Sequence, residues 1–210
     1  MSETFSTSRS VSLKSIAFIA LGLMTVFVVS QRDIQLLNAH SPLRQHYAGA
    51  GWLVAIHGTF GALALLIGPF QFWTWLRQTY PKIHRTMGRL YILGAFIAAP
   101  IAIPVSIMVD PPELLMASIF QSAAWLFTTA TALYYIRTRR FIQHREWMIR
   151  SYPFAVVFVF ARVFLVLPPI EKFGVVGLDS VVWTCIALAG FLPSVLIALN
   201  NTAPRSVVTS

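Results

Sequence analysis

The chain has 210 residues, of which 57% are hydrophobic and 11% are charged, and its mean hydropathy is +0.70. Soluble domains carry about 25% charged residues, so this composition excludes an ordinary soluble protein and indicates a polytopic membrane protein. The net charge of +9 comes from basic residues in short segments between apolar stretches, a pattern typical of membrane topology and not of nucleic-acid binding. The single cysteine, Cys185, excludes an intramolecular disulfide and a cysteine-rich metal site.

Apolar segments dominate the chain from near its start to near its end. Each approaches the ~20 residues that a helix needs to cross about 30 Å of hydrocarbon. They cover residues 13–30, 50–76, 86–109, 113–136, 147–167 and 179–200. We therefore predict an all-α fold, a six-helix transmembrane bundle formed by one domain over 13–200. Residues 1–12 are expected to form a flexible cytoplasmic N-terminus, and residues 201–210 a cytoplasmic tail.

The first apolar segment has two interpretations, a signal peptide or an uncleaved helix. No small-x-small cleavage motif follows it, which favours the uncleaved helix. Lysine and arginine gather before this segment, between the second and third, and between the fourth and fifth. Because positive loops stay in the cytoplasm, we expect both termini and both basic loops there, in a multi-pass protein of the bacterial inner membrane.

The two basic turns look alike. The first reads WTWLRQTYPKIHRTMGRLY and the second ALYYIRTRRFIQHREWMIRSY. Each contains aromatic residues, a His-Arg pair and then the pattern Arg-x-Tyr. We interpret helices two to five as two hairpins that form a parallel repeat. In that repeat, His84 and His144 occupy equivalent positions at the start of an ascending helix.

These histidines form the first candidate site, together with Arg85, Arg89, Arg145 and Arg150. A helix N-terminus and neighbouring guanidinium groups disfavour imidazolium, and a neutral imidazole is what a haem iron or another metal requires. Gly88 lies one turn after His84 and is expected to leave clearance for a flat ligand. The simpler interpretation is that the basic residues set the topology and hold lipid phosphates.

The second candidate site lies in the outer half of the bundle. His57, Gln121 and Arg162 are expected at similar depths on three helices, and polar groups at that depth usually face inward. They form either a pocket or an interhelical hydrogen-bond network that fixes the packing. Arg162 requires an anion, and the nearest carboxylates lie at the rim of the membrane: Asp110, Glu113, Glu171 and Asp179.

Three separated motifs carry a family resemblance: HGTFGALALLIGPFQF, PKIHRTMGRLY and HREWMIRSY. Over residues 50–165 the chain resembles a bacterial family of predicted membrane proteins, domain of unknown function 2306. The resemblance implies a multi-helix membrane fold and no established activity.

A more distant similarity is to the ascorbate-reducible transmembrane cytochrome b family. That resemblance implies six helices, cytoplasmic termini and one haem-ligand histidine on each of helices two to five. His57, His84 and His144 match three of these positions. Gln121 stands at the fourth, so only the inner pair, His84 and His144, matches as ligands of a haem.

The leading hypothesis is therefore an electron-transfer protein with haem b between His84 and His144. The arginines would hold propionates or an anionic electron donor, and the outer pocket a quinone or similar acceptor. The alternative is a non-redox protein that binds phospholipid or another anionic ligand, with a purely structural polar cluster. The sequence does not decide whether the chain is an enzyme, and it leaves open a homo-oligomer or a partner subunit.

Overall fold

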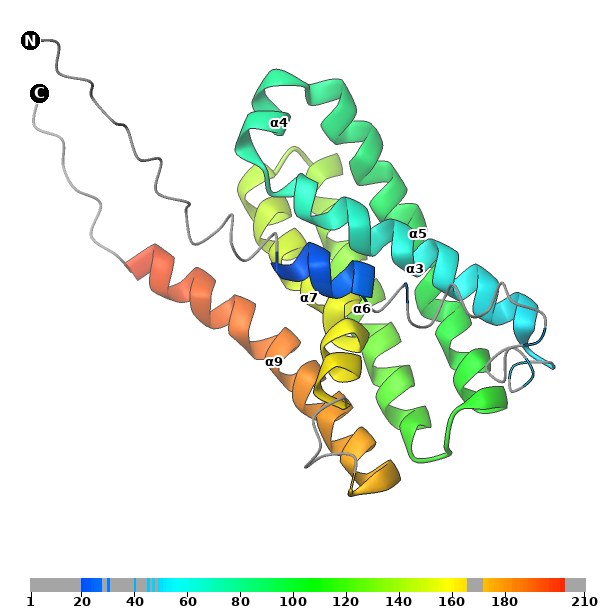
Figure 1. The fold of residues 1–210 in the computed structure, drawn as a ribbon. Helices are drawn as coiled ribbons and strands as arrows, with labels where there is room; N and C mark the ends of the chain where they lie inside the picture. Colours follow the sequence, from blue (N-terminus) through cyan, green and yellow to red (C-terminus); the bar gives the residue numbers. More distant parts are fainter. Residues whose placement is uncertain are drawn as a thin grey trace, which may run out of the picture.

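In the computed structural model, residues 20–27, 30, 40, 45, 47, 49–165 and 172–202 are described. All regular structure in these ranges is helical (Figure 1). The main elements are α3 (Gly51–Gln71), α4 (Thr74–Thr79), α5 (Pro81–Val109), α6 (Leu114–Arg137), α7 (Phe141–Leu165) and α9 (Gly174–Thr202). All of these except α4 are long and apolar enough to cross a membrane. Half of the predicted first span, 13–30, lies outside the described residues, so the count of six stays a prediction.

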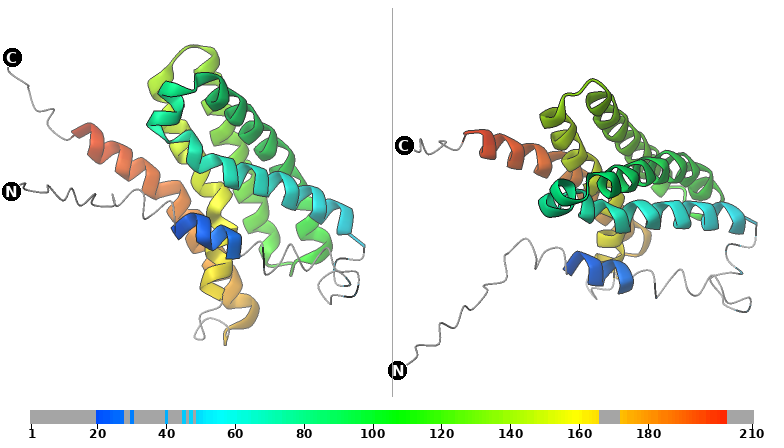
Figure 2. Two further views of the ribbon diagram at one scale, coloured as in Figure 1. Left: turned by 45° about the horizontal axis from the view of Figure 1, so that its top comes forward. Right: turned by 90° about the horizontal axis from the view of Figure 1, so that it is seen from above.

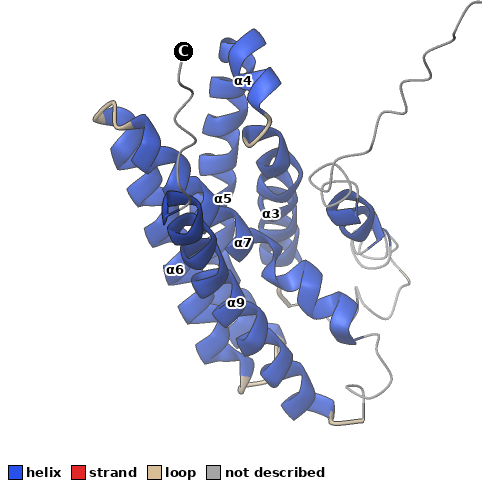
Figure 3. Cartoon of the chain, turned by 90° about the vertical axis from the view of Figure 1, so that its left-hand side faces the viewer, coloured by secondary structure: helices blue, strands red, loops and turns tan. Residues whose placement is uncertain are grey.

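The long helices pack side by side as a bundle. The most extensive contacts join α3 to α5, α6 to α7, α7 to α9 and α5 to α6. The helices are joined by short turns within 49–165 (Figure 3). Helix α9 diverges from the others toward its C-terminal end (Figure 2). The turn that contains α4 and the turn between α6 and α7 lie at one end of the bundle (Figure 1). We call this the basic end; its position in the cytoplasm stays a prediction, as does the interpretation of the two hairpins as a repeat.

Several helix boundaries differ from those of the apolar segments. The segment 50–76 is divided at Phe72 and Trp73 into α3 and the short α4. Helices α5, α7 and α9 begin at Pro81, Phe141 and Gly174, before the apolar segments at 86, 147 and 179. Hydropathy marks the part of a helix inside hydrocarbon, whereas these helices continue through a polar interfacial turn. At α5 the start is also favoured by proline in the first helical position.

Close helix approach explains two glycines in the core. A Cβ added at Gly94 of α5 would lie 2.7 Å from the backbone oxygen of Phe60, so the backbones of α3 and α5 approach each other closely there. A Cβ added at Gly68 of α3 would overlap the ring of Tyr152 on α7. The Tyr152 hydroxyl donates a hydrogen bond to the Leu65 carbonyl, 3.1 Å away. Small residues therefore let α3 lie close to both α5 and α7.

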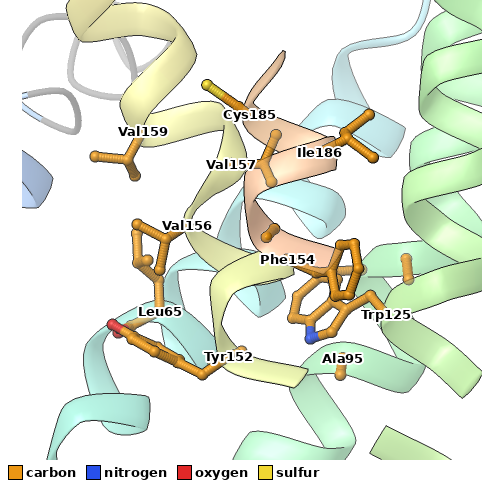
Figure 4. Close-up of a cluster of buried hydrophobic side chains, with 14 of the residues drawn as sticks. Leu65, Ala95, Trp125, Tyr152, Phe154, Val156, Val157, Val159, Cys185 and Ile186 are labelled. Atoms are coloured by element: carbon orange, nitrogen blue, oxygen red, sulfur yellow. The ribbon is translucent and has the colours of Figure 1, made fainter. Parts of the chain in front are cut away.

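Helix α7 lies at the centre of the apolar core. Its buried side chains contact residues of α3, α6 and α9, as the close-up of this cluster shows (Figure 4). The labelled members include Leu65, Trp125, Phe154, Val157, Cys185 and Ile186. Cys185 is buried in α9, where it packs as a small apolar residue of the core.

Candidate functional site

His84 and His144 occupy the same position in their helices. Each is the fourth residue of its helix, and each backbone N–H donates to the residue four positions earlier, Tyr80 or Arg140, over 3.0 Å. Both side chains are partly buried, and the two imidazoles lie near enough to interact electrostatically. The structure therefore brings the two predicted histidines together at the basic end.

The hydrogen bonds of the two rings differ. His144 Nδ1 lies 2.9 Å from the Ala132 carbonyl on α6. A carbonyl only accepts, so Nδ1 carries the proton and Nε2 keeps its lone pair. Metal-bound histidines are commonly oriented in this way by a backbone carbonyl. His84 Nδ1 is buried and has no hydrogen-bond partner. The donor chemistry of this pair fits axial ligation of a haem iron.

Gln71, the last residue of α3, was not predicted as part of this site. It is 8% exposed, and its Nε2 is buried without a hydrogen-bond partner. A Cβ added at Gly88 would lie 3.2 Å from Gln71 Oε1. The clearance predicted beside Gly88 is therefore wrong, because the Gln71 side chain fills it. The available signal was one amide between the aromatic residues of the motif GPFQF.

The predicted arginines are distributed over two places. Arg85, Arg89 and Arg145 are exposed at the basic end, and Arg85 Nε donates to the Pro81 carbonyl at 3.1 Å. Arg77 of α4, which was not predicted, interacts electrostatically with His84.

Arg150 lies instead against α9. Its Nε donates to Ser194 Oγ at 3.2 Å, and Nη1 lies 3.8 Å from Glu146 Oε2. Its guanidinium carbon is 5.1 Å from the centre of the Trp147 ring. These contacts engage Arg150 in the packing of α7 on α9.

The second predicted group lines one cavity of about 190 Å³ between α3, α5, α6 and α7. His57, Gln121 and Arg162 all contribute to its wall, and so does Asp110. Arg162 is an exposed residue and Gln121 a buried one, so the cavity extends inward from a charged mouth to a buried amide. We call it the outer cavity.

Two backbone carbonyls orient the polar side chains of this cavity. His57 Nδ1 donates to the Ala98 carbonyl of α5 over 2.9 Å. Gln121 Nε2 donates to the Phe154 carbonyl of α7 over 2.9 Å. Gln121 is 5% exposed, and its Oε1 has no hydrogen-bond partner. The Gln121 amide therefore has a fixed orientation, and its Oε1 is buried beyond the reach of a water molecule.

Between the two sites lies a group of hydrogen-bonded side chains that was not predicted. Trp125 Nε1 donates to Tyr91 Oη at 3.2 Å, and Tyr91 Oη lies 2.9 Å from Ser151 Oγ. Ser151 Oγ lies 2.7 Å from Thr129 Oγ1, which donates to the Trp125 carbonyl at 2.7 Å. Tyr91, Ser151 and Thr129 are fully buried. These four residues form a closed ring of hydrogen bonds, which we call the polar ring.

The direction of every bond in the polar ring follows from counting protons. Thr129 uses its one hydroxyl proton on the Trp125 carbonyl, so Ser151 must donate to Thr129. Ser151 has then used its proton, so Tyr91 must donate to Ser151. Each hydroxyl in the ring donates once and accepts once, so the ring has no unsatisfied member.

Sequence spacing connects the polar ring to the inner histidines. Tyr91 follows His84 by seven residues, and Ser151 follows His144 by seven, so each pair shares a helix face. Trp125 also lines the outer cavity. The spacing of seven was the signal that could have identified Tyr91 and Ser151 from the sequence.

Metal ligation by larger clusters finds no support in the described part of the chain. Across residues 49–165 and 172–202 and the shorter described pieces, no three or more His, Cys, Asp or Glu side chains are arranged to hold a metal ion.

Comparison with known proteins identifies the family. No curated protein and no solved structure matches this chain. A family described as "Predicted membrane protein (DUF2306)" matches residues 54–199, which contain the inner histidines, the polar ring and most of the outer cavity. This match covers more than half of the chain, and the long apolar helices agree with the description. The chain is therefore an integral membrane protein that belongs to the DUF2306 family.

Proposed function

We propose that this protein transfers electrons within the membrane and holds one b-type haem between His84 and His144. The observation that carries the proposal is the meeting of two partly buried imidazoles at the same helical position, one of them oriented by a backbone carbonyl. A bound haem would supply an iron that accepts and releases one electron. The side chains of the protein would hold and orient this group.

The surroundings of the two histidines support the same role. The Ala132 carbonyl fixes the tautomer of His144, which leaves Nε2 as the ligating atom. His84 Nδ1 and Gln71 Nε2 are buried polar atoms without partners, a costly state that a bound group would relieve. Arg77 and the exposed arginines of the basic end provide positive potential for propionates or an anionic electron donor. In this proposal, the outer cavity receives a ring-shaped redox partner such as a quinone.

The experiment is a reduced-minus-oxidised absorption spectrum of the protein purified from cells supplied with haem. We expect the sharp bands of a bis-histidine haem, lost in His84→Ala and in His144→Ala. The double variant should lose no more than either single variant, because both ligands serve one iron. His57→Ala is the matched control, since His57 also bonds a backbone carbonyl but lies in the outer cavity.

A colourless wild-type protein, or haem retained in both single variants, would contradict the proposal. The second candidate function would then apply: binding of an anionic phospholipid at the basic end. It is favoured by the exposed side chains of Arg85, Arg89 and Arg145. Native mass spectrometry should then show anionic lipid retained by the wild type and lost in the triple alanine variant.

A further inference from the structure

We infer that the outer cavity binds one neutral, planar six-membered ring, and that Gly58 and Gly61 keep clear the space that this ring occupies. This inference rests on the proposed role of the outer cavity as a site for a ring-shaped partner, and it names the residues that select that partner by size. It does not depend on a haem at the inner histidines.

One face of α3 forms a wall of the cavity. The residues of α3 that line it are Val54, His57, Gly58, Gly61, Ala62 and Leu65. Their spacings of three and four residues place all of them on the same face of the helix. Gly58 and Gly61 lie in the middle of this face, between Val54 and Leu65. The middle of the wall therefore carries no side chains.

Helix packing does not require these two glycines. Among the described residues, a Cβ added at Gly58 would meet no atom within 4 Å, and one added at Gly61 would meet only the Ala98 Cβ, at 3.9 Å. At Gly68 and Gly94, by contrast, an added Cβ would overlap or crowd a neighbouring helix. Glycine in a helix interior costs about 0.5–1 kcal/mol relative to alanine. At Gly58 and Gly61 this cost is balanced by no closer packing, and its effect is open space in the cavity.

The other helices provide surfaces that match a ring. Trp125 of α6 and Phe154 and Phe158 of α7 line the same cavity, and Ala99 and Ala102 of α5 add small apolar side chains. Aromatic side chains bind a second ring in offset-stacked or edge-to-face arrangements, with an attraction beyond that of the buried area. Because burial in apolar surroundings disfavours a charge, these walls favour a neutral ring.

The volume of the cavity, about 190 Å³, also suits a ring. An engineered apolar cavity of about 150 Å³ binds benzene, so one six-membered ring with small substituents fits here. A whole lipid acyl chain exceeds this space. A rigid ring also loses little conformational freedom on binding, whereas a flexible chain must be ordered. The cavity should therefore prefer a ring to the acyl chains that surround the protein.

The first test is fluorine NMR of 4-fluorotoluene, with the wild-type protein in lipid nanodiscs and empty nanodiscs as the blank. We expect line broadening that saturates with ligand and is reversed by 1,4-dimethylbenzene. Decane, compared at equal concentration in the lipid, should compete at least about tenfold more weakly. No saturable binding above the blank, or equal competition by decane, would overturn the inference.

Substitutions then test the role of the glycines. Gly58→Leu should weaken the binding of 4-fluorotoluene at least about tenfold, because its side chain occupies the space of the ring. Gly58→Ala and Gly61→Ala should have affinities between that of Gly58→Leu and that of the wild type. Gly51→Leu is the matched control, the same change at the exposed first residue of α3, outside the cavity wall, and should keep the wild-type affinity.

The stability of the variants separates a filled site from a damaged fold. Because an added side chain at Gly58 enters open space, we expect both Gly58 variants to unfold at an SDS concentration no lower than the wild type does. Unchanged affinity in a folded Gly58→Leu would overturn the role of the glycines. If this variant does not fold, the two alanine variants and the wild-type competition decide the inference.

The same preparations separate this inference from the proposed function. Haem bands without saturable ring binding would leave the haem proposal standing and overturn the inference. A colourless protein that binds 4-fluorotoluene would do the opposite. The inference further predicts that His84→Ala, which removes the proposed haem ligand, leaves the affinity for 4-fluorotoluene within about twofold of the wild type.

Discussion

The middle of the bundle and its two ends treat buried polar groups in opposite ways. In the polar ring, every hydroxyl of Tyr91, Ser151 and Thr129 donates once and accepts once. At the basic end, His84 Nδ1 and Gln71 Nε2 are buried without a partner, and in the outer cavity Gln121 Oε1 is in the same state. The ring is made of hydroxyl groups and one indole, whereas the unsatisfied atoms belong to a histidine and two glutamines.

The difference separates structural polar groups from functional ones. A closed ring of hydrogen bonds removes the cost of burying its members and fixes three helices relative to one another. Unsatisfied buried atoms raise the free energy of the folded state, so they are retained where something else binds. The unsatisfied atoms lie at the two proposed sites, and the polar ring lies between them.

The largest expected effect tests how tightly the bundle is packed between the ring and the basic end. In Gly68→Ala the new methyl group would overlap the Tyr152 ring, which must move. We expect the free energy of unfolding to fall by about 2–3 kcal/mol, measured by SDS titration in mixed micelles. In the control, Gly58→Ala, the new methyl group meets no atom within 4 Å. Equal losses in the two variants would show that close packing at Gly68 does not distinguish this region.

The second prediction breaks the polar ring itself. Tyr91→Phe leaves Trp125 Nε1 without its acceptor and Ser151 without its donor, so we expect a loss of about 1–3 kcal/mol in the same titration. The double variant with Ser151→Ala should lose less than the sum of the two single variants, because both substitutions break one ring. Additive losses would mean that the bonds act independently.

A smaller effect is expected where a polar contact lies outside the ring. Ser194→Ala removes one hydrogen bond from Arg150, which keeps its contacts with Glu146 and Trp147. We expect a loss of about 0.5–1 kcal/mol in the free energy of unfolding. A loss as large as that of Tyr91→Phe would mean that the contact of α7 with α9 stabilises the fold as much as the polar ring does.

The smallest effect is expected at the basic end. Gln71→Leu removes a buried donor that has no partner and keeps a similar volume. Such a replacement is nearly neutral or stabilising, so the free energy of unfolding of the ligand-free protein should change by less than about 0.5 kcal/mol or rise. A loss of more than 1 kcal/mol would mean that the Gln71 amide stabilises the fold, and the contrast between middle and ends would fail.

Hydropathy and charge were sufficient to predict the long helices, because length and polarity decide which segments cross a membrane. They did not predict where α5, α7 and α9 begin, since a helix can continue through a polar interfacial turn that carries His84 or His144. The division between α3 and α4 at Phe72 was missed for a related reason. Aromatic residues continue the apolar pattern although the helix has ended.

The sequence indicated that His84 and His144 come together, but it misplaced Arg150 and did not indicate which polar residues surround the histidines. Histidine and arginine are rare in membrane helices and attract attention, whereas serine, threonine, tyrosine and tryptophan are common there. Tyr91 and Ser151 therefore looked ordinary, although they face each other across the bundle. Gln71 was missed because its contact with Gly88 depends on how α3 lies on α5.

The polar ring also has a consequence for the movement of charge. A hydroxyl chain conducts protons when one member can accept an extra proton at one end and release another at the far end. Here the chain closes on Trp125, so these hydroxyl groups offer no path for a proton from one side of the bundle to the other. In the proposed function, an electron that passes this layer leaves its proton behind. Such a step senses the membrane voltage, at up to about 2.3 kcal/mol per charge for each 100 mV crossed.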